Sequence, residues 1–130
     1  MHPKHFREYI DDPRIVAAIA DAEHESHGRI YIYISHRLIT DPLGQARIRF
    51  HKLGLSKLHE QRASVLIYLA PRTHKFAIVG DTAIHERCGD EFWKGLAEEL
   101  GRDLKAGQIT EGLLNAIGRI KTTLQKHFPA

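Results

Sequence analysis

Residues 65–70, Val-Leu-Ile-Tyr-Leu-Ala, form the longest apolar run in this chain of 130 residues. The run is far too short to span a bilayer, and its continuous apolar character is typical of a strand that is covered on both faces. Residues 71–74, Pro-Arg-Thr-His, predict a short turn directly after it. Residues 76–79, Phe-Ala-Ile-Val, then predict another strand, close enough to pair with the first as a hairpin.

A third strand is predicted upstream at residues 29–35, Arg-Ile-Tyr-Ile-Tyr-Ile-Ser. Its isoleucines point to one face and Tyr31 and Tyr33 point to the other, so both faces are large, mostly apolar and in need of cover. A helix between this strand and the central run would form a right-handed crossover that joins two parallel strands.

Two helices are predicted before the central run, from apolar residues that recur at spacings of three and four. Each begins with Asp-Pro, at residues 12–13 and 41–42, because aspartate caps a helix and proline suits its first position. Gly28 and Gly54 are expected to end these helices, the first in a left-handed cap. Their apolar faces consist of Ile15, Ile19 and Ala22, and of Leu43, Ala46, Phe50 and Leu53.

Two further helices are predicted after the hairpin, one from Gly89-Asp90 to Gly107 and one that closes the chain. Trp93 shares the apolar face of the first of these, so we expect it to be buried against the sheet. The segment between Gly80-Asp81 and Gly89-Asp90 has an irregular pattern, and residues 4–10 predict a short N-terminal helix. The two apolar faces consist of Trp93, Leu96, Ala97, Leu100 and Leu104, and of Leu113, Ile117, Ile120 and Leu124.

This order of elements predicts an α/β fold, namely a three-layer α/β/α sandwich with a small mixed sheet. The sheet would contain one strand–helix–strand crossover plus a hairpin. Residues 1–130 are expected to form a single domain with its core at about residues 8–128, because a chain of this length has no room for a second independent core.

Composition excludes several classes of protein. Hydrophobic residues make up 42% and charged residues 27%, as in a folded globular domain. The net charge of +3 comes from interleaved signs, so no nucleic-acid-binding tail is expected. Cys88 is the single cysteine, which excludes an internal disulfide and fits a cytoplasmic protein. No segment predicts a membrane span or a secretion signal, and the fingerprints of nucleotide-binding and serine hydrolase sites are absent.

Three segments of the chain resemble the TPM domain, and in particular the short, soluble bacterial members of that family. They are AAIADAE at residues 17–23, ARIRFHKLGLSKLHEQRASVLIYLA at residues 46–70 and FAIVGDTAIHERCGDEFW at residues 76–93. The resemblance runs from about residue 8 to the C-terminus and implies a three-layer α/β/α domain. It also implies three candidate activities: binding of calcium or another divalent ion, acid phosphatase activity, and an accessory role beside membrane complexes.

The chain departs from the family pattern at two places. Members typically carry Asn-Gly or Asp-Asn-Gly before the second strand, where this chain has Arg62-Ala63-Ser64. Many also carry an acidic residue after the glycine at the first strand, where this chain has Arg29. Since both changes remove negative charge or turn chemistry, we expect any affinity for Ca²⁺ or another divalent cation to be weak, on the order of millimolar.

The candidate ligand site lies where the third strand meets the helix at Asp90, and comprises Gly80, Asp81, Arg87, Gly89 and Asp90. Asp81 and Asp90 would be the metal ligands if they converge, and otherwise each fits a simple helix cap. Free N–H groups at the helix start could receive a phosphate oxygen, with Arg72 or Arg87 as a clamp.

Other candidates carry weaker signals. Glu23 and His27 are four residues apart, which would place them on one helix face as metal ligands, and His85 and Cys88 could form half of a zinc site or a nucleophile pair. No third partner for either pair is evident, so surface histidines and a structural cysteine are expected instead. The cations of the second helix and the following loop fit a solvated face: Arg47, Arg49, Lys52, Lys57 and Arg62.

These observations favour a binding or accessory module for a protein or a membrane-protein complex, with no nucleic-acid partner. One alternative is a weak metal-assisted acid phosphatase that uses Asp81 and Asp90. The other is a domain that binds a divalent cation without turnover. The sequence leaves the catalytic residues, the partner and the oligomeric state open.

Overall fold

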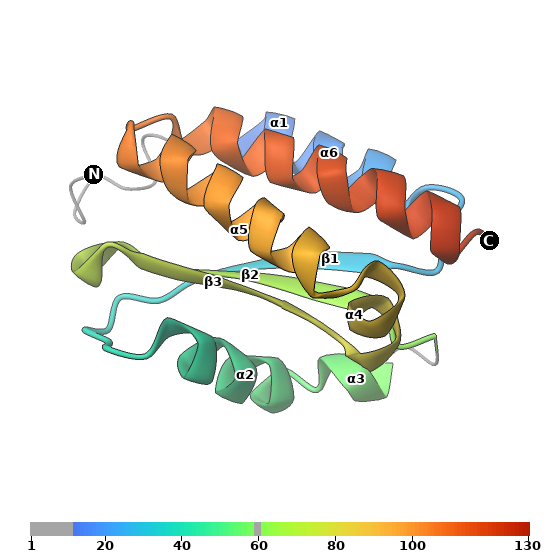
Figure 1. The fold of residues 1–130 in the computed structure, drawn as a ribbon, viewed down its shortest axis with the longest axis horizontal. Helices are drawn as coiled ribbons and strands as arrows, with labels where there is room; N and C mark the ends of the chain where they lie inside the picture. Colours follow the sequence, from blue (N-terminus) through green and yellow to red (C-terminus); the bar gives the residue numbers. More distant parts are fainter. Residues whose placement is uncertain (1–11, 59–60) are drawn as a thin grey trace.

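The computed structural model describes residues 12–58 and 61–130 (Figure 1). The helix expected at residues 4–10 lies outside these ranges. Within them, none of the helices combines the length and hydrophobicity that crossing a bilayer requires. The elements, in chain order, are α1 (Asp12–Glu23), β1 (Arg29–Ile34), α2 (Pro42–Lys52), α3 (Leu55–Leu58), β2 (Ser64–Ala70), η2 (Pro71–Thr73), β3 (Lys75–Gly80), α4 (Thr82–Cys88), α5 (Asp90–Lys105) and α6 (Ile109–His127).

The sheet has the order β1-β2-β3, with β1 parallel and β3 antiparallel to the central β2. Ile67 of β2 pairs with Ile32 on one side and with Ile78 on the other. The predicted parallel crossover and the predicted hairpin are therefore both confirmed. Among residues 12–58 and 61–130, β3 pairs only with β2, so it forms one edge of the sheet.

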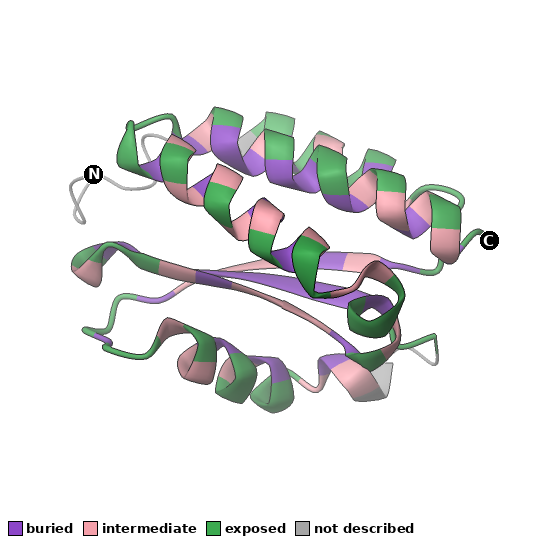
Figure 2. Cartoon of the chain, viewed as in Figure 1, coloured by how far each residue is buried: buried purple, intermediate pink, exposed green. Residues whose placement is uncertain are grey.

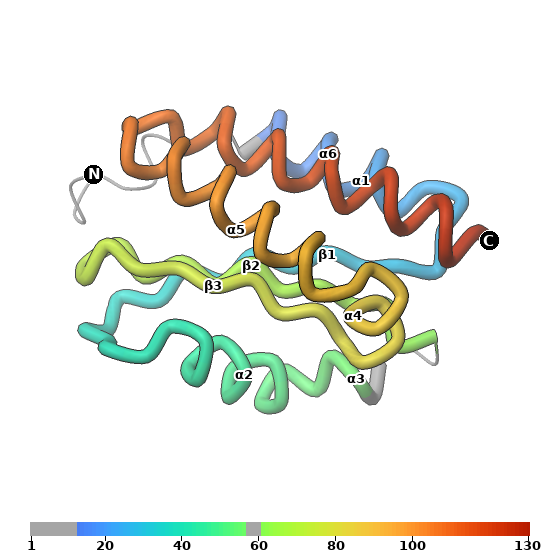
Figure 3. Tube along the Cα trace, viewed as in Figure 1, coloured from blue at the N-terminus to red at the C-terminus, as the bar shows by residue number. Residues whose placement is uncertain are grey.

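The helices cover both faces of this sheet, which confirms the three-layer sandwich. Helices α1, α5 and α6 lie on one face, whereas α2 and α3 lie on the other (Figures 1 and 3). All seven residues of β2 are buried between the layers (Figure 2). Val65, Ile67 and Leu69 belong to the large core beneath α1, α5 and α6, whereas Tyr68 and Ala70 belong to a smaller core beneath α2.

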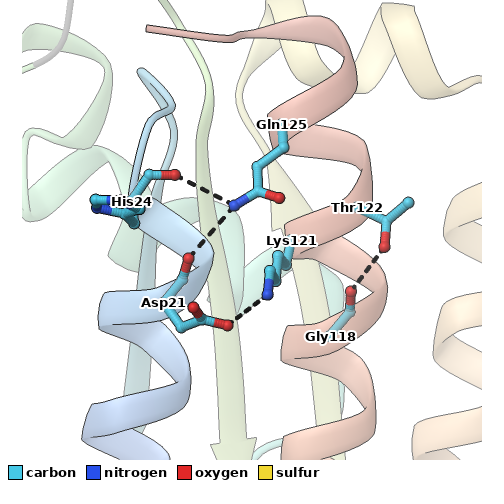
Figure 4. Close-up of polar contacts among 6 residues, drawn as sticks. All are labelled: Asp21, His24, Gly118, Lys121, Thr122 and Gln125. Carbon is cyan, nitrogen blue, oxygen red and sulfur yellow. Dashed lines mark hydrogen bonds and ion pairs between the residues drawn. The ribbon is translucent and has the colours of Figure 1, made fainter.

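Polar contacts join helices α1 and α6 side by side in the same helical layer (Figure 4). The Lys121 ammonium contacts the Asp21 carboxylate. The Gln125 amide donates hydrogen bonds to the backbone carbonyls of Asp21 and His24 at the end of α1. It thus gives the His24 carbonyl a donor and adds a second donor to the Asp21 carbonyl, which also accepts from the His24 N–H at 3.3 Å.

Four expectations about the helices need correction. Residues 82–88 form helix α4 and residues 55–58 form helix α3, where no helix was expected. Helix α1 ends at Glu23, before Gly28, and Gly28 has no left-handed backbone. A Cβ on Gly28 would lie 2.2 Å from Leu124 Cδ2, so this glycine permits close approach to α6. Leu43 and Leu53 are 42% and 41% exposed, because α2 contacts the sheet mainly through its buried residues, Ala46 and Phe50.

Candidate functional site

Asp81 follows β3 and is 4% exposed, so its carboxylate lies in the protein interior. Its Oδ1 atom accepts a hydrogen bond of 2.7 Å from the Thr82 N–H and one of 2.9 Å from the Ser56 hydroxyl. Its backbone carbonyl accepts from the His85 N–H at 2.9 Å. Asp81 is therefore the N-cap of α4 and also ties α3 to the end of the sheet.

Two buried oxygens at this place have no hydrogen-bond partner among the described residues, Asp81 Oδ2 and Ser64 Oγ. Asp81, directly after β3, lies opposite Ser64 of β2, since the Asp81 N–H donates to the Ser64 carbonyl at 2.8 Å. Residues opposite one another project their side chains to the same face of a sheet. A buried carboxylate oxygen without a hydrogen-bond donor lowers the free energy of unfolding, so this part of the core is destabilised by its unsatisfied polar atoms.

Asp90 occupies a different environment at the start of α5. Its side chain is 98% exposed, and its Oδ1 atom lies 3.5 Å from His85 Nε2. Helix α4 separates Asp90 from Asp81, and a helix of seven residues is about 10 Å long. The structure therefore does not bring the two predicted metal ligands together.

The described residues around Asp81 do not fit a divalent-cation centre. One orphaned carboxylate oxygen and one serine hydroxyl are far fewer than the six to eight oxygens that Ca²⁺ prefers. Within residues 12–58 and 61–130, no three His, Cys, Asp or Glu side chains gather as a metal-binding group.

The other residues of the candidate site have structural roles. A Cβ on Gly80 would lie 2.7 Å from Cη2 and Cζ2 of Trp93, so Gly80 makes room for that indole. Trp93 is 9% exposed, which confirms its predicted burial, and its Nε1 donates to the His85 carbonyl at 3.3 Å. Gly89 joins α4 to α5 with a φ of 78°, which favours glycine. The Arg87 guanidinium lies 5.7 Å from the centre of the Phe128 ring.

The two weaker candidate pairs, Glu23 with His27 and His85 with Cys88, are not arranged as a metal site or a nucleophile pair. Because α1 ends at Glu23, Glu23 and His27 do not share a helix face, and Glu23 Oε2 accepts instead from the Ile30 N–H at 2.8 Å. Burial raises the pKa of the Cys88 thiol, although a hydrogen bond with Thr123 acts in the opposite direction. A nucleophilic cysteine needs a lowered pKa, so the thiol is poorly suited to that role.

The predicted phosphate clamps lie at opposite ends of the sheet. Arg72 in η2 donates to the His36 carbonyl at 3.3 Å, whereas Arg87 lies on α4. Arg62, in the turn where the resemblance led us to expect Asn-Gly, has a φ of 56°. The turn before β2 thus adopts the left-handed conformation that Asn and Gly accommodate most readily, with arginine in their place.

The surface is hollowed at two neighbouring places that the sequence did not indicate. One hollow, of about 490 Å³, lies beside η2, the start of β3 and the second half of α5. The other, of about 370 Å³, runs along β3 between α2 and α5. Phe76 lines both hollows, so we treat them together as the β3 groove. The predicted hairpin could have indicated this groove, because the hairpin strand that has no further partner lies at an edge of the sheet.

Comparisons with known proteins agree with this architecture. The family model described as the TPM domain matches residues 10–123. The solution structure of the BA42 protein from the psychrophilic bacterium Bizionia argentinensis is 29% identical, with a TM-score of 0.81 over 92% of this chain and 84% of that chain. The N-terminal domain of the cg2496 protein from Corynebacterium glutamicum shares the fold at 16% identity and a TM-score of 0.66, over 86% of this chain and 70% of that chain. No curated protein matches the chain.

Proposed function

The chain belongs to the TPM domain family, and we propose that it acts as a binding module that docks onto another protein through the β3 groove. The observation that carries this proposal is the groove itself, which has a strand edge as its floor and helices α2 and α5 as its walls. Leu43, Trp93 and Ala97 contribute apolar atoms to those walls. Exposed apolar surface rimmed by polar groups is typical of protein-binding sites.

The outer surface of α2 supports the same proposal. Ile48 is 50% exposed, and Leu43 and Leu53 are both more than 40% exposed. Leu43 also lines the groove, so the apolar surface continues from the groove toward the outside of the helix. Scattered exposed apolar residues are ordinary, but those that adjoin a concave site extend the area that a partner can bury.

Photo-crosslinking in the host cell tests this function. A benzophenone amino acid placed at Leu43 or Ala97 would stand in opposite walls of the groove. Asn115, which is exposed on α6, is the matched control position. We expect both groove positions to give the same discrete adduct and Asn115 to give none. Absence of an adduct from the groove, or an identical adduct from Asn115, would contradict the proposal.

The phosphatase and cation-binding alternatives have less support, because α4 separates Asp81 from Asp90. Both can be tested directly with protein that has been treated with a chelator. Calorimetric titration with Ca²⁺, Mg²⁺ and Zn²⁺ would detect a cation site. Metal-dependent turnover of a phosphomonoester that is lost in Asp81→Asn would support the phosphatase alternative.

A further inference from the structure

We propose that the outer edge of β3 binds an extended, acidic segment of a partner protein, which adds to the sheet as a fourth strand. The inference rests on the binding function proposed above and names the chemistry of the partner. In this mode of recognition, main-chain hydrogen bonds provide affinity and the side chains on either face of the added strand provide specificity.

The hydrogen-bonding pattern of the sheet shows which backbone groups of β3 are free. The Asp81 N–H donates to the Ser64 carbonyl, which makes these two residues a hydrogen-bonded pair. Such pairs alternate along an antiparallel ladder, so every second residue of β3 directs its N–H and C=O groups away from β2. These outward residues are Phe76, Ile78 and Gly80. Within the described ranges, no hydrogen bond beyond the sheet occupies their backbone groups.

In the part of the chain that the structure describes, the groove leaves this edge accessible along its whole length. The hollow between α2 and α5 is lined by every residue from 76 to 80, and the neighbouring hollow continues past Lys75. A strand of six residues spans about 20 Å, which is enough for a ladder of several hydrogen bonds. The two helices flank the edge, as Figure 1 shows, and neither pairs with it.

Apolar surface lies on both faces of the position that an added strand would take. Phe76 and Ile78 pack on the core beneath α5, whereas Ala77 belongs to the core beneath α2. An incoming strand would therefore place alternate side chains toward Trp93 on one face and Leu43 on the other. Its central residues should be apolar on both faces.

The charge of the groove selects an acidic partner. Its lining contains four cations and neither aspartate nor glutamate; the cations are Arg47, Lys75, Lys94 and Lys105. In the part of the chain that the structure describes, none of the four takes part in an ion pair. Lys75 and Lys105 lie at one end of β3, and Arg47 and Lys94 lie along it. Acidic residues at the two ends of an apolar centre would complement this arrangement.

The same cations disfavour pairing between two copies of this chain. If two β3 edges met, Lys75, Arg47 and Lys94 of each copy would add to the positive potential of the other. Lysine on an edge strand is a common means of preventing such contact. The partner is therefore expected to be a different chain.

The probe for this inference is a fluorescent peptide, acetyl-Glu-Asp-Val-Val-Val-Ile-Asp-Glu-amide, titrated into the full chain. One control peptide replaces the four acidic residues with lysine. The second control is a pair of peptides with N-methyl groups on alternate residues, one pair member on the odd positions and the other on the even positions. One of the two therefore lacks the N–H donors that would face β3. We expect the acidic peptide to bind at least ~10-fold more tightly than the lysine peptide and than one of the two N-methylated peptides.

Matched variants locate the binding on the protein. Arg47→Glu with Lys94→Glu should weaken binding at least ~10-fold, whereas Lys52→Glu with Lys126→Glu, an equal change of charge at positions outside the groove, should change it less than about twofold. Ile78→Pro removes an outward N–H and none of the N–H groups bonded to β2, which an edge strand tolerates, and should abolish binding, whereas Ile78→Val retains the N–H and should preserve it. Hydrogen exchange at the Phe76, Ile78 and Gly80 amides should slow when the peptide is bound.

Several results would overturn the inference. These are equal binding of the acidic, lysine and N-methylated peptides, unchanged exchange at the three outward amides, or a dimer of this chain that Ile78→Pro disrupts. If groove crosslinks form in cells while no peptide binds, the inference fails and the binding function stands. If neither crosslinks nor peptide binding occur, both fail.

Discussion

Gly80 and Trp93 depend on one another, because the indole occupies the space that a Cβ at residue 80 would need. Gly80→Ala should lower the free energy of unfolding by about 1–3 kcal/mol through overpacking, and Trp93→Ala should lower it by about 3–5 kcal/mol through loss of buried surface. Urea denaturation measures both. Gly95→Ala is the control, since a Cβ added at Gly95 would have no neighbour within 4 Å and alanine favours the helix. An unchanged midpoint for Gly80→Ala would contradict the close packing of the indole on residue 80.

The Cys88 thiol should make the protein less stable as pH rises. Burial raises its pKa above the ordinary value of 9.0, so the folded state retains a proton that the unfolded state releases. The stabilising difference is fully present below the ordinary pKa and is lost above it, so the free energy of unfolding falls as pH rises past about 9. Comparison of the chain with Cys88→Ser from pH 7 to about pH 10 measures this slope.

Alkylation provides the second readout for Cys88. Iodoacetamide should react more slowly with the folded chain than with the chain in denaturant at the same pH, because the thiolate is the reactive form. A faster reaction in the folded chain would indicate a lowered pKa, and the nucleophile pair with His85 would regain support.

At the scale of the elements, the strands and the larger helices could be predicted because their patterns are local. The continuous run of β2 and the alternation of β1 indicate strands covered on both faces, and both are covered. Gly54 and Gly107 follow α2 and α5 with φ values of 67° and 79°, the backbone that favours glycine at a helix end. Gly28 carries the same sequence signal for another reason, namely its contact with Leu124 in α6. That contact joins residues far apart in sequence, and no local pattern reveals it.

Helix α4 could not be predicted from periodicity, because Ile84 is its one fully buried residue and a single residue has no period. Its N-cap signal was present in Asp81, which the sequence left open between capping and metal binding. The structure assigns the cap. The convergence of Asp81 with Asp90 depended on the segment between them being a loop, and as a helix that segment holds the two residues apart.

Substitution of Asp81 separates capping from cation binding. Asp81→Ala removes the cap of α4 and the acceptor for Ser56, so the free energy of unfolding should fall by about 1–2 kcal/mol. Asp81→Asn retains an acceptor oxygen and removes the buried charge, so it should change stability by less than about 1 kcal/mol. Thermal unfolding with EDTA and with excess Ca²⁺ measures both. Calcium stabilisation that Asp81→Asn abolishes would contradict the structural role.

At the scale of the whole molecule, the direction of the strands decides which end of the sheet carries a site. Ligands in open α/β sheets bind beyond the carboxyl ends of the parallel strands, which here are Ile34 and Ala70. Because β3 is antiparallel, its own end at Gly80 lies beside Val65, at the amino end of β2. The candidate site at Asp81 therefore lies at the opposite end from the usual position. The β3 groove instead extends toward the carboxyl end of β2, where Leu69 and Ala70 line it.

The C-terminal residues are bound to the loop between α1 and β1, and this contact should support the whole domain. Phe128 is buried, its carbonyl accepts from the His27 N–H at 2.8 Å, and the Ala130 N–H donates to the Glu25 carbonyl at 2.9 Å. Deletion of residues 128–130 should lower the free energy of unfolding by about 3 kcal/mol or more, because a buried phenylalanine and both backbone hydrogen bonds to this loop are lost. Lys126→Ala, at a neighbouring position on α6, is the control.

If the chain is one cooperative domain, the deletion should shift the fluorescence transition of Trp93 and the far-ultraviolet circular dichroism transition to the same lower midpoint. Trp93 lies on α5 and α6 packs beside that helix, so loosening of the C-terminus reaches the indole only through the shared core. A fluorescence transition that stays in place while the dichroism transition moves would show that the outer layer unfolds separately from the sheet. The prediction of a single domain would then be wrong, because α1 and α6 would constitute a unit of their own.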